Sequence, residues 1–349
     1  MIDYVRLHYS IDIQEKAFSP LMWKTSTTDS GQRFFWHTKR GVKIRYYSTT
    51  KVLTVDGKIL MLLYDTQVQN FDDIYGTKRE LFIDDMNAVL KRLLPSCDIN
   101  ICDFSVTRID YCFNVETPYV REYIDFLGRA FQAVDHGNRK NYTEEHALNG
   151  SVYIRTASDY RDNSNKNYTV NFYNKLDRLQ YLQRTGVQVS EADMALAENI
   201  LRLEVQCGYQ MIQRQCKRFC IENSFGCLFD CNIALNTISN AYSLVFKGNW
   251  QADYYTYQEA KRRLKGKQAA LKTILAAATN HSITAPKYAY SRNQAKEAGV
   301  YPFCFLPSNS SVSHLENPMK LLLKKADLFD MDTNSKKLHD KNSNLETEK

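Results

Sequence analysis

Long apolar runs are missing from this sequence of 349 residues. The longest, from Ile59 to Tyr64, is far shorter than the ~18 residues that a membrane-spanning helix requires. Glycine and proline are also scarce, at 13 and 7 residues, which excludes a collagen-like chain. The first residues lack the basic-then-apolar plan of an export signal. These absences predict a cytoplasmic protein with no membrane partner, and the 44% of hydrophobic residues suffices for a substantial core.

The usual metal-binding spacings are absent as well. None of the nine cysteines forms a C-x2-C knuckle, and no two of the seven histidines are separated by one residue. Four cysteines do fall close together, at Cys216, Cys220, Cys227 and Cys231. They leave two interpretations open: a zinc site, or small apolar-like side chains buried in two helices.

Acidic residues are absent from one long stretch, residues 260–296, which holds nine basic residues. The whole chain carries 46 lysines and arginines against 39 acidic residues, a net charge of +7. Lysine and arginine neutralise phosphates, and nearby tyrosines can stack on bases, so this stretch predicts DNA contact. The basic residues expected to make it are Lys261, Arg262, Arg263, Lys265 and Lys267. The alternative is a solvated basic helix.

Alternating apolar and polar residues predict strands at 4–9 and 42–47, and an Asp56-Gly57 pair predicts a hairpin turn between strands at 51–54 and 59–63. Further strands are expected at 104–115, 151–155, 168–175 and 200–207. Helical spacing predicts helices at 77–94, 120–134, 176–182, 191–198, 209–220 and 228–244.

Three of the strands carry an unusual polar face, which can be identified because side chains alternate across a strand. The pairs on that face are Arg108 with Asp110, Arg202 with Glu204, and Tyr173 with Lys175. One half-exposed strand of this kind is ordinary. If the three strands are neighbours in one sheet, however, all six side chains converge on a single patch.

Such a patch has a definite chemistry. Two carboxylates can bind Mg²⁺ or Mn²⁺, which prefer oxygen ligands. A tyrosine hydroxyl, with an ordinary pKa of ~10, is a poor nucleophile unaided. A metal ion and a neighbouring ammonium group would stabilise both the phenolate and the charge that builds on a phosphate. The set therefore fits attack by Tyr173 on a phosphodiester, with Asp110 and Glu204 as metal ligands.

Four motifs, in this order, resemble those of a known family. They are Met1–Asp3 ahead of a strand, Val106–Asp110 (VTRID), Val170–Lys175 (VNFYNK) and Leu201–Glu204 (LRLE). The chain resembles the rolling-circle replication initiation proteins, above all the gene II replication endonuclease family of filamentous phages. The likeness covers residues 1–225 and extends weakly to about residue 325.

The resemblance implies a site-specific nickase that starts rolling-circle replication of a phage or plasmid in a bacterial host cell. Tyr173 would cut one strand at a single-stranded or supercoiled replication origin and stay joined to the 5′ phosphate. The freed 3′ hydroxyl would prime a host polymerase, with a host helicase as a second partner. Lys175 would assist near the phosphate, and Arg108 and Arg202 would orient carboxylates or contact DNA.

The chain departs from many rolling-circle initiators in lacking their His-hydrophobic-His metal motif. The resemblance therefore implies a site built from Asp110 and Glu204 with a third ligand, for which His8, His37 and Asp65 all remain open. Two other functions remain open too: a metal-dependent nuclease that uses water in place of Tyr173, and a non-catalytic DNA-binding protein.

The expected fold is α+β, a mostly antiparallel sheet with helices on one face, of the split β-α-β type. We expect a catalytic nickase domain over residues 1–240 and a smaller, basic helical DNA-binding domain over 241–330. The polar residues 331–349 are expected to be a disordered tail.

Overall fold

The computed structural model describes residues 2–64, 66, 68, 77–124, 127, 139–141, 151–156, 168–246, 254–278, 283–300, 305–306 and 314–322. The chain divides into two compact units, one of residues 1–118 and 136–241 and the other of 119–135 and 242–349. The expected domain boundary at 240 lies beside this division, whereas 119–135 groups with the second unit. The tail at 331–349 and residues 125, 126 and 128–134 of the expected helix lie outside the described residues.

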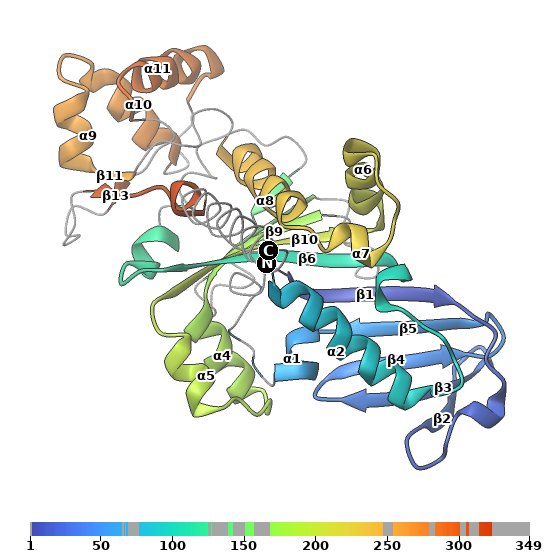
Figure 1. Cartoon of the computed structure of the whole chain (residues 1–349). Coiled ribbons are helices and arrows are strands. Elements are labelled where there is room, and N and C mark those ends of the chain that lie inside the picture. Colours follow the sequence, from blue (N-terminus) through green and yellow to red (C-terminus); the bar gives the residue numbers. More distant parts are fainter. Residues whose placement is uncertain are drawn as a thin grey trace, which may run out of the picture. The chain divides into compact units, whose positions relative to one another are not determined.

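The first unit is built on a ten-stranded sheet with the order β2-β3-β4-β5-β1-β6-β10-β9-β8-β7, in which every neighbouring pair is antiparallel (Figure 1). The strands are β1 (Ile2–Ser10), β2 (Lys24–Thr27), β3 (Arg33–Lys39), β4 (Val42–Tyr47), β5 (Val52–Gly57), β6 (Ser105–Glu116), β7 (Arg139–Asn141), β8 (Ser151–Thr156), β9 (Tyr168–Asn174) and β10 (Ile200–Gly208). Because β6 and β9 both oppose β10, they run parallel with β10 between them, the spacing of a split β-α-β unit. The predicted α+β class is confirmed.

One hairpin is misplaced in the sequence-based assignment. Arg40 and Gly41, at φ 49° and 80°, form the two-residue turn between β3 and β4. The turn predicted at Asp56-Gly57 is wrong, because β5 runs through both residues and the following segment forms helix α1 (Ile59–Tyr64). Gly57 is needed for close packing rather than for a turn: a Cβ on it would lie 2.9 Å from the Cα of Val42 on β4.

Helices cover the apolar face of the sheet. Tyr111 of β6 donates a hydrogen bond to the carbonyl of Leu228 at 2.8 Å, which ties helix α7 (Phe225–Leu228) to this face. Helices α6 (Tyr209–Phe219) and α8 (Cys231–Phe246) flank α7 along the chain, and α6 contacts both β6 and β10. Helix α2 (Thr77–Leu93), where the sequence predicts one, accepts a hydrogen bond from Trp23 at the carbonyl of Leu93.

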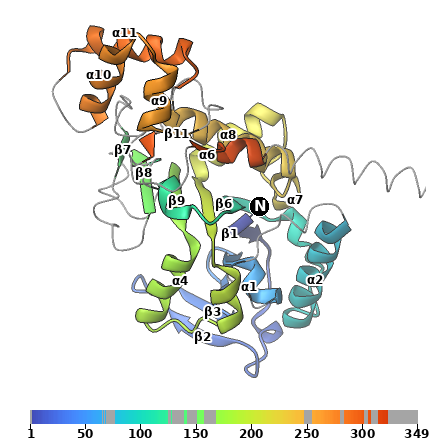
Figure 2. The same cartoon turned by 90° about the vertical axis from the view of Figure 1, so that its left-hand side faces the viewer.

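The opposite face is also covered in part, which the sequence did not predict. Helices α4 (Lys175–Arg184; labelled in Figure 2) and α5 (Glu191–Leu196) follow β9. Their N-termini are capped by the side chains of Asn174 and Ser190. Val68 packs with Leu179 of α4, and the Val68 carbonyl accepts a hydrogen bond from Arg202 on the polar face of β10. The helices therefore do not lie on one face only, and several polar side chains of β6 and β10, such as Asp110 and Arg202, are buried on this second face.

The second unit is small and mainly helical. It contains α9 (Tyr257–Arg263), α10 (Gln268–Ala278) and α11 (Ala285–Glu297), with a three-stranded sheet of β11 (Tyr254–Thr256), β12 (Phe305–Leu306) and β13 (His314–Leu315). Leu264, Leu271, Ile274 and Ala295 form its buried core. In the part of the chain that the structure describes, we find no helix both long enough and apolar enough to cross a membrane.

Candidate active site

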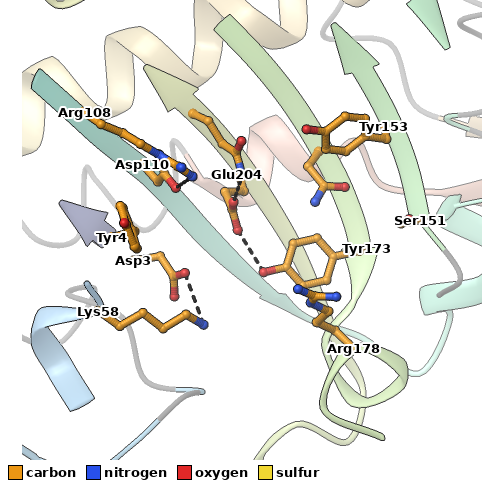
Figure 3. A pocket seen from close by; sticks show the side chains of 12 residues that line it. Asp3, Tyr4, Lys58, Arg108, Asp110, Ser151, Tyr153, Tyr173, Arg178 and Glu204 are labelled. Atoms are coloured by element: carbon orange, nitrogen blue, oxygen red, sulfur yellow. Dashed lines mark hydrogen bonds and ion pairs between the residues drawn. The ribbon is translucent and has the colours of Figure 1, made fainter. Parts of the chain in front are cut away.

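A cavity of about 310 Å³ opens on the polar face of β6, β10 and β9, which are adjacent strands (Figure 3). Arg108 and Asp110 of β6, Tyr173 of β9 and Glu204 of β10 all line it. The structure thus brings together four of the six side chains that the sequence places on the polar faces of three separate strands. The other two, Arg202 and Lys175, are not among the residues that line the cavity. The cavity is also lined by residues to which the sequence analysis gave no role.

The pairing register explains this convergence. Side chains directly opposite each other on antiparallel strands share a face. Gln206 lies opposite Asp110, and Glu204 lies opposite Asn171. Both amides therefore reach the same cavity as the two carboxylates, since alternate residues of each strand point the same way.

Asp3 and Tyr4 also line the cavity, although consecutive strand residues normally point to opposite faces. The register of β1 against β6 shifts between Ile2 and Tyr4, as at a β-bulge. Such a bulge re-aims a side chain, so both residues can face the cavity. The bulge thus adds a third carboxylate to the site.

The Tyr173 hydroxyl donates a hydrogen bond of 2.9 Å to Oε2 of Glu204. The other carboxylate oxygen, Oε1, accepts from Nε2 of Gln206, also at 2.9 Å. Both Tyr173 and Glu204 are buried. Burial raises the pKa of the Tyr173 hydroxyl well above its usual range, and the Glu204 charge adds to this rise. The resting tyrosine is therefore protonated, with an acceptor for its proton already in place.

Asp110 is held by Arg108, whose Nε and Nη2 donate hydrogen bonds of 2.9 and 2.6 Å to its two oxygens. Burial raises the pKa of Asp110 to about 7; Arg108 opposes this rise, and the charges of Glu204 and Asp3 add to it. Close carboxylates in a buried site repel one another, and added positive charge would relieve that repulsion.

Arg202 is completely buried and fully occupied. Its guanidinium donates to Asp3 at 2.7 Å, to Asn114 at 2.8 Å and to the Val68 carbonyl at 2.5 Å. Of the two roles expected for this arginine, the structure fits orientation of a carboxylate, here Asp3. Contact with DNA does not fit a side chain with no exposed surface. Arg108, which remains partly exposed, orients Asp110 in the same way.

Two lysines lie near the cavity. Lys175 is the first residue of α4 rather than part of the strand, and it is buried. Burial lowers the pKa of Lys175 well below its usual range; Arg202 and Lys58 lower it further, while Asp3 and Glu204 oppose them. Lys58 lines the cavity itself, with its Nζ 3.4 Å from Oδ2 of Asp3.

The donor atoms in the cavity fit a hard divalent cation. Among the described residues, no three His, Cys, Asp or Glu side chains are grouped closely enough to hold a metal ion. Two amide oxygens enlarge the set, because Oε1 of Gln206 and Oδ1 of Asn171 are buried with no hydrogen-bond partner among those residues. The orientation of Gln206 follows from its chemistry: Glu204 can only accept, so the amide turns its nitrogen toward it and leaves Oε1 unpaired. Carboxylate and amide oxygens are ligands that Mg²⁺ and Mn²⁺ accept.

Of the three residues considered as a further ligand, the two that the structure describes, His8 and His37, are not placed for it. His37 points to the apolar side of β3, where its Nδ1 lies 2.7 Å from the Met22 carbonyl. His8 lies on β1 and is not among the residues that line the cavity. Asp65 lies outside the described residues.

The basic stretch of the second unit is bordered by two glutamates that pair with three of its members. Glu259 forms ion pairs with Arg262 at 2.7 Å and Arg263 at 3.0 Å, and Glu297 pairs with Lys267 at 3.1 Å. Hydrogen bonds from the two arginines lower the pKa of Glu259 to about 2. Lys261 and Lys265 are exposed. The stretch therefore carries less unpaired positive charge than its lack of acidic residues indicates.

The four clustered cysteines differ in exposure. Cys216 is buried in α6, Cys220 is exposed at the end of that helix, and Cys227 and Cys231 are half-buried. None of them forms a disulfide. Cys216 fits the interpretation of a small buried side chain, which the i, i+4 spacing alone could not distinguish from a zinc ligand.

The cavity residues missed by sequence reasoning are Asp3, Tyr4, Lys58, Ser151, Tyr153, Asn171, Arg178 and Gln206. For two of them a signal was available. Asn171 has the parity of Tyr173 on β9, and Gln206 has the parity of Glu204 on β10. Both amides therefore belong to the polar faces on which Tyr173 and Glu204 were identified. Comparison with known proteins adds no further guide, because no protein-family model and no curated protein matches this chain.

Proposed function

We propose that the chain is a site-specific DNA nickase that starts rolling-circle replication through a covalent link between Tyr173 and the 5′ phosphate. The observation that supports this most is the hydrogen bond of 2.9 Å from the Tyr173 hydroxyl to Glu204, inside a cavity lined by cations and oxygen donors. A nucleophile next to a base, with the base held by a third group, is the usual arrangement for covalent catalysis. Gln206 is that third group here.

The proposed step is a transesterification. The Tyr173 oxygen attacks phosphorus while its proton passes to Oε2 of Glu204. The bond from phosphorus to the 3′ oxygen breaks, and that oxygen takes the electron pair and a proton from water. A phosphotyrosine and a free 3′ hydroxyl result. The raised pKa of Tyr173 requires this transfer to accompany the attack, because little phenolate exists beforehand.

Cationic side chains of the cavity would hold the phosphate. Lys58 and Arg178 both line it, and neither is fully buried. Positive groups placed before the reaction stabilise the charge that develops on the phosphate oxygens. Asp110, Glu204 and the amide oxygen of Gln206 would hold Mg²⁺ or Mn²⁺. When bound, the ion would act as a Lewis acid on a phosphate oxygen.

A trapping assay tests the proposal. The full chain is mixed with labelled DNA that carries its own candidate origin, with and without Mn²⁺, and the products are separated on a denaturing gel. Wild-type protein should give a metal-dependent adduct of protein and DNA, and Tyr173→Phe should give none. Tyr153→Phe is the matched control, because Tyr153 lies in the same cavity on the neighbouring strand β8.

The other outcomes identify the competing functions. Cleavage without an adduct, equal in wild type and Tyr173→Phe, would mean a nuclease that uses water. An adduct that persists in Tyr173→Phe and disappears in Tyr153→Phe would mean that Tyr153, and not Tyr173, is the nucleophile. Binding without cleavage or adduct on the correct origin would leave a DNA-binding protein.

A further inference from the structure

The sheet carries a second notable surface, on the five strands from β2 to β1. Buried residues alternate with less buried ones along β4, and Phe35 is the one buried residue of β3, so one face holds the core and the other stays partly open. The core face is formed by side chains such as Phe35, Ile44 and Tyr46. We call the opposite side of β1–β5 the outer face.

Three half-exposed aromatic rings stand on the outer face. They are Phe34 and Trp36 of β3 and Tyr47 of β4. Phe34 and Tyr47 are paired across the strands and stack with ring centroids 5.5 Å apart. The Lys24 ammonium lies over the Trp36 ring at 5.1 Å. Aromatic rings with a free side are platforms on which unpaired bases stack.

Basic side chains surround these rings. Register places Arg45 opposite Trp36, and Lys43 follows two residues earlier on β4 with the same parity. Arg6 of β1 lies on this face too, opposite Asp56. The acidic residues on this side of β1–β5, among the described residues, are Asp56 and, beside the cavity, Asp3. Asp56 forms ion pairs with Arg6 at 3.4 Å and Arg45 at 3.9 Å. The face is therefore positive as a whole and matches a polyanion.

The outer face continues directly into the cavity. Tyr4 lines the cavity, and its hydroxyl donates a hydrogen bond to Asp56 of the outer face. The Arg108 guanidinium lies over the Tyr4 ring at 4.4 Å. Arg108 is also the cross-strand partner of Arg6. A chain lying on the outer face would thus pass from Arg6 to Arg108 and reach the cavity that holds Tyr173.

We propose that the outer face of β1–β5 binds single-stranded DNA and leads it to the Tyr173 cavity. Bases stack on Trp36 and on the Phe34–Tyr47 pair, and phosphates meet Lys24, Lys43 and Arg45. A duplex offers no free base faces to these rings, so the surface favours single strands. Only the link to cleavage rests on the proposed function, because binding itself needs neither the tyrosine nor a metal.

The test is equilibrium binding of labelled oligothymidine, and of a duplex of equal length, to full-length Tyr173→Phe protein in EDTA. Adding Trp36→Ala should weaken oligothymidine binding about tenfold and change duplex binding less than about twofold, because base stacking is lost. Adding Lys43→Ala should weaken single-strand binding and flatten its salt dependence.

Arg33→Ala is the matched control. Arg33 belongs to β3, the strand of Trp36, and is exposed, but it has the parity of the core face and lies over Phe35. Arg33→Ala removes one positive charge, as Lys43→Ala does, and should leave oligothymidine binding within about twofold of its original affinity. Trp36→Phe, which keeps a ring and disturbs folding less, should retain most of the affinity.

Two results would overturn the proposal. One is unchanged oligothymidine binding in both Trp36→Ala and Lys43→Ala, and the other is equal weakening of single-strand and duplex binding by Trp36→Ala. Its failure is separable from that of the proposed nickase. If wild-type protein forms no adduct while Trp36→Ala still loses single-strand affinity selectively, the binding surface stands and the tyrosine chemistry falls. The reverse pattern leaves the nickase and removes the surface.

Discussion

Arg202 and Asp3, 199 residues apart in the sequence, form an ion pair of 2.7 Å that joins β10 to β1 across β6. The arginine side chain has no exposed surface, and it also donates a hydrogen bond to Asn114 of the third strand, β6. The pair therefore couples three strands beneath the cavity. It also fixes the carboxylate that the β-bulge brings into the site.

Removing this arginine should destabilise the protein strongly. Arg202→Met leaves Asp3 and the Val68 carbonyl buried without their main donor, and breaking a buried ion pair on one side costs about 3–5 kcal/mol. Urea denaturation of the full chain would measure the change. Arg178→Met, in the same cavity but less buried, should cost under about 1 kcal/mol. A loss below about 1 kcal/mol for Arg202→Met would contradict the structural role.

Asp110 should make the metal-free protein less stable as pH rises. The pKa of Asp110 is raised from 3.8 to about 7 by burial, so between about pH 4 and 7 the folded protein holds a proton that the unfolded chain has lost. The stability that this proton contributes is complete near pH 4 and is lost as pH rises through about 7. Asp110→Asn, which stays neutral, should therefore melt at a higher temperature than wild type at pH 8.

Thermal melts in EDTA from pH 5 to 8.5 would check this prediction. The advantage of Asp110→Asn should be a few degrees at pH 8 and should shrink toward pH 5. Asp84→Asn, an exposed site on α2, should track wild type throughout. A constant difference between Asp110→Asn and wild type at every pH would show that Asp110 does not titrate in this window.

Much of the fold was readable from the sequence because alternation and capping act locally. Strands β4, β6, β9 and β10 fall where the period-two pattern predicts them. The caps at Asn174 and Ser190 use residue types that favour this position, but the sequence analysis extended the strand through Asn174 to Lys175. The exception was Asp56-Gly57, a turn signal in isolation. Here the glycine instead allows close approach to Val42, a relationship between strands that no local pattern contains.

The candidate site was predictable only where it obeys alternation. Asp110, Tyr173 and Glu204 were found by parity on regular strands, and the register brought them together. Asp3 could not be placed in this way, because the bulge that re-aims it interrupts the parity rule. Lys58 was lost through the misplaced hairpin, which put it in a turn rather than between β5 and α1.

Gln206 should contribute directly to cation binding. Its Oε1 is buried and unpaired among the described residues, next to Glu204, so a bound ion would satisfy it. Gln206→Leu should weaken Mn²⁺ binding at least about tenfold, measured by calorimetry or by the electron paramagnetic resonance of free Mn²⁺. Gln183→Leu, exposed on α4, should bind Mn²⁺ like wild type. Equal affinity in Gln206→Leu and wild type would remove Gln206 from the ligand set.

The ion pairs of α9 should decide which basic residues of the second unit contribute to duplex DNA binding. Glu259 already neutralises much of the charge of Arg262 and Arg263, whereas Lys261 and Lys265 are exposed. A lysine that meets a phosphate adds about 0.9 to the slope of log affinity against log salt concentration. Changing both Lys261 and Lys265 to alanine should therefore lower that slope by close to 2. Arg262→Ala should lower it by clearly less than 1, because its guanidinium is held by Glu259 before any DNA arrives. If Arg262→Ala lowers the slope as much as each lysine does, the glutamate pairing seen in the free protein does not limit binding. If neither change alters the slope, the basic stretch is a solvated helix, and the outer face of the sheet is left as the surface that meets DNA.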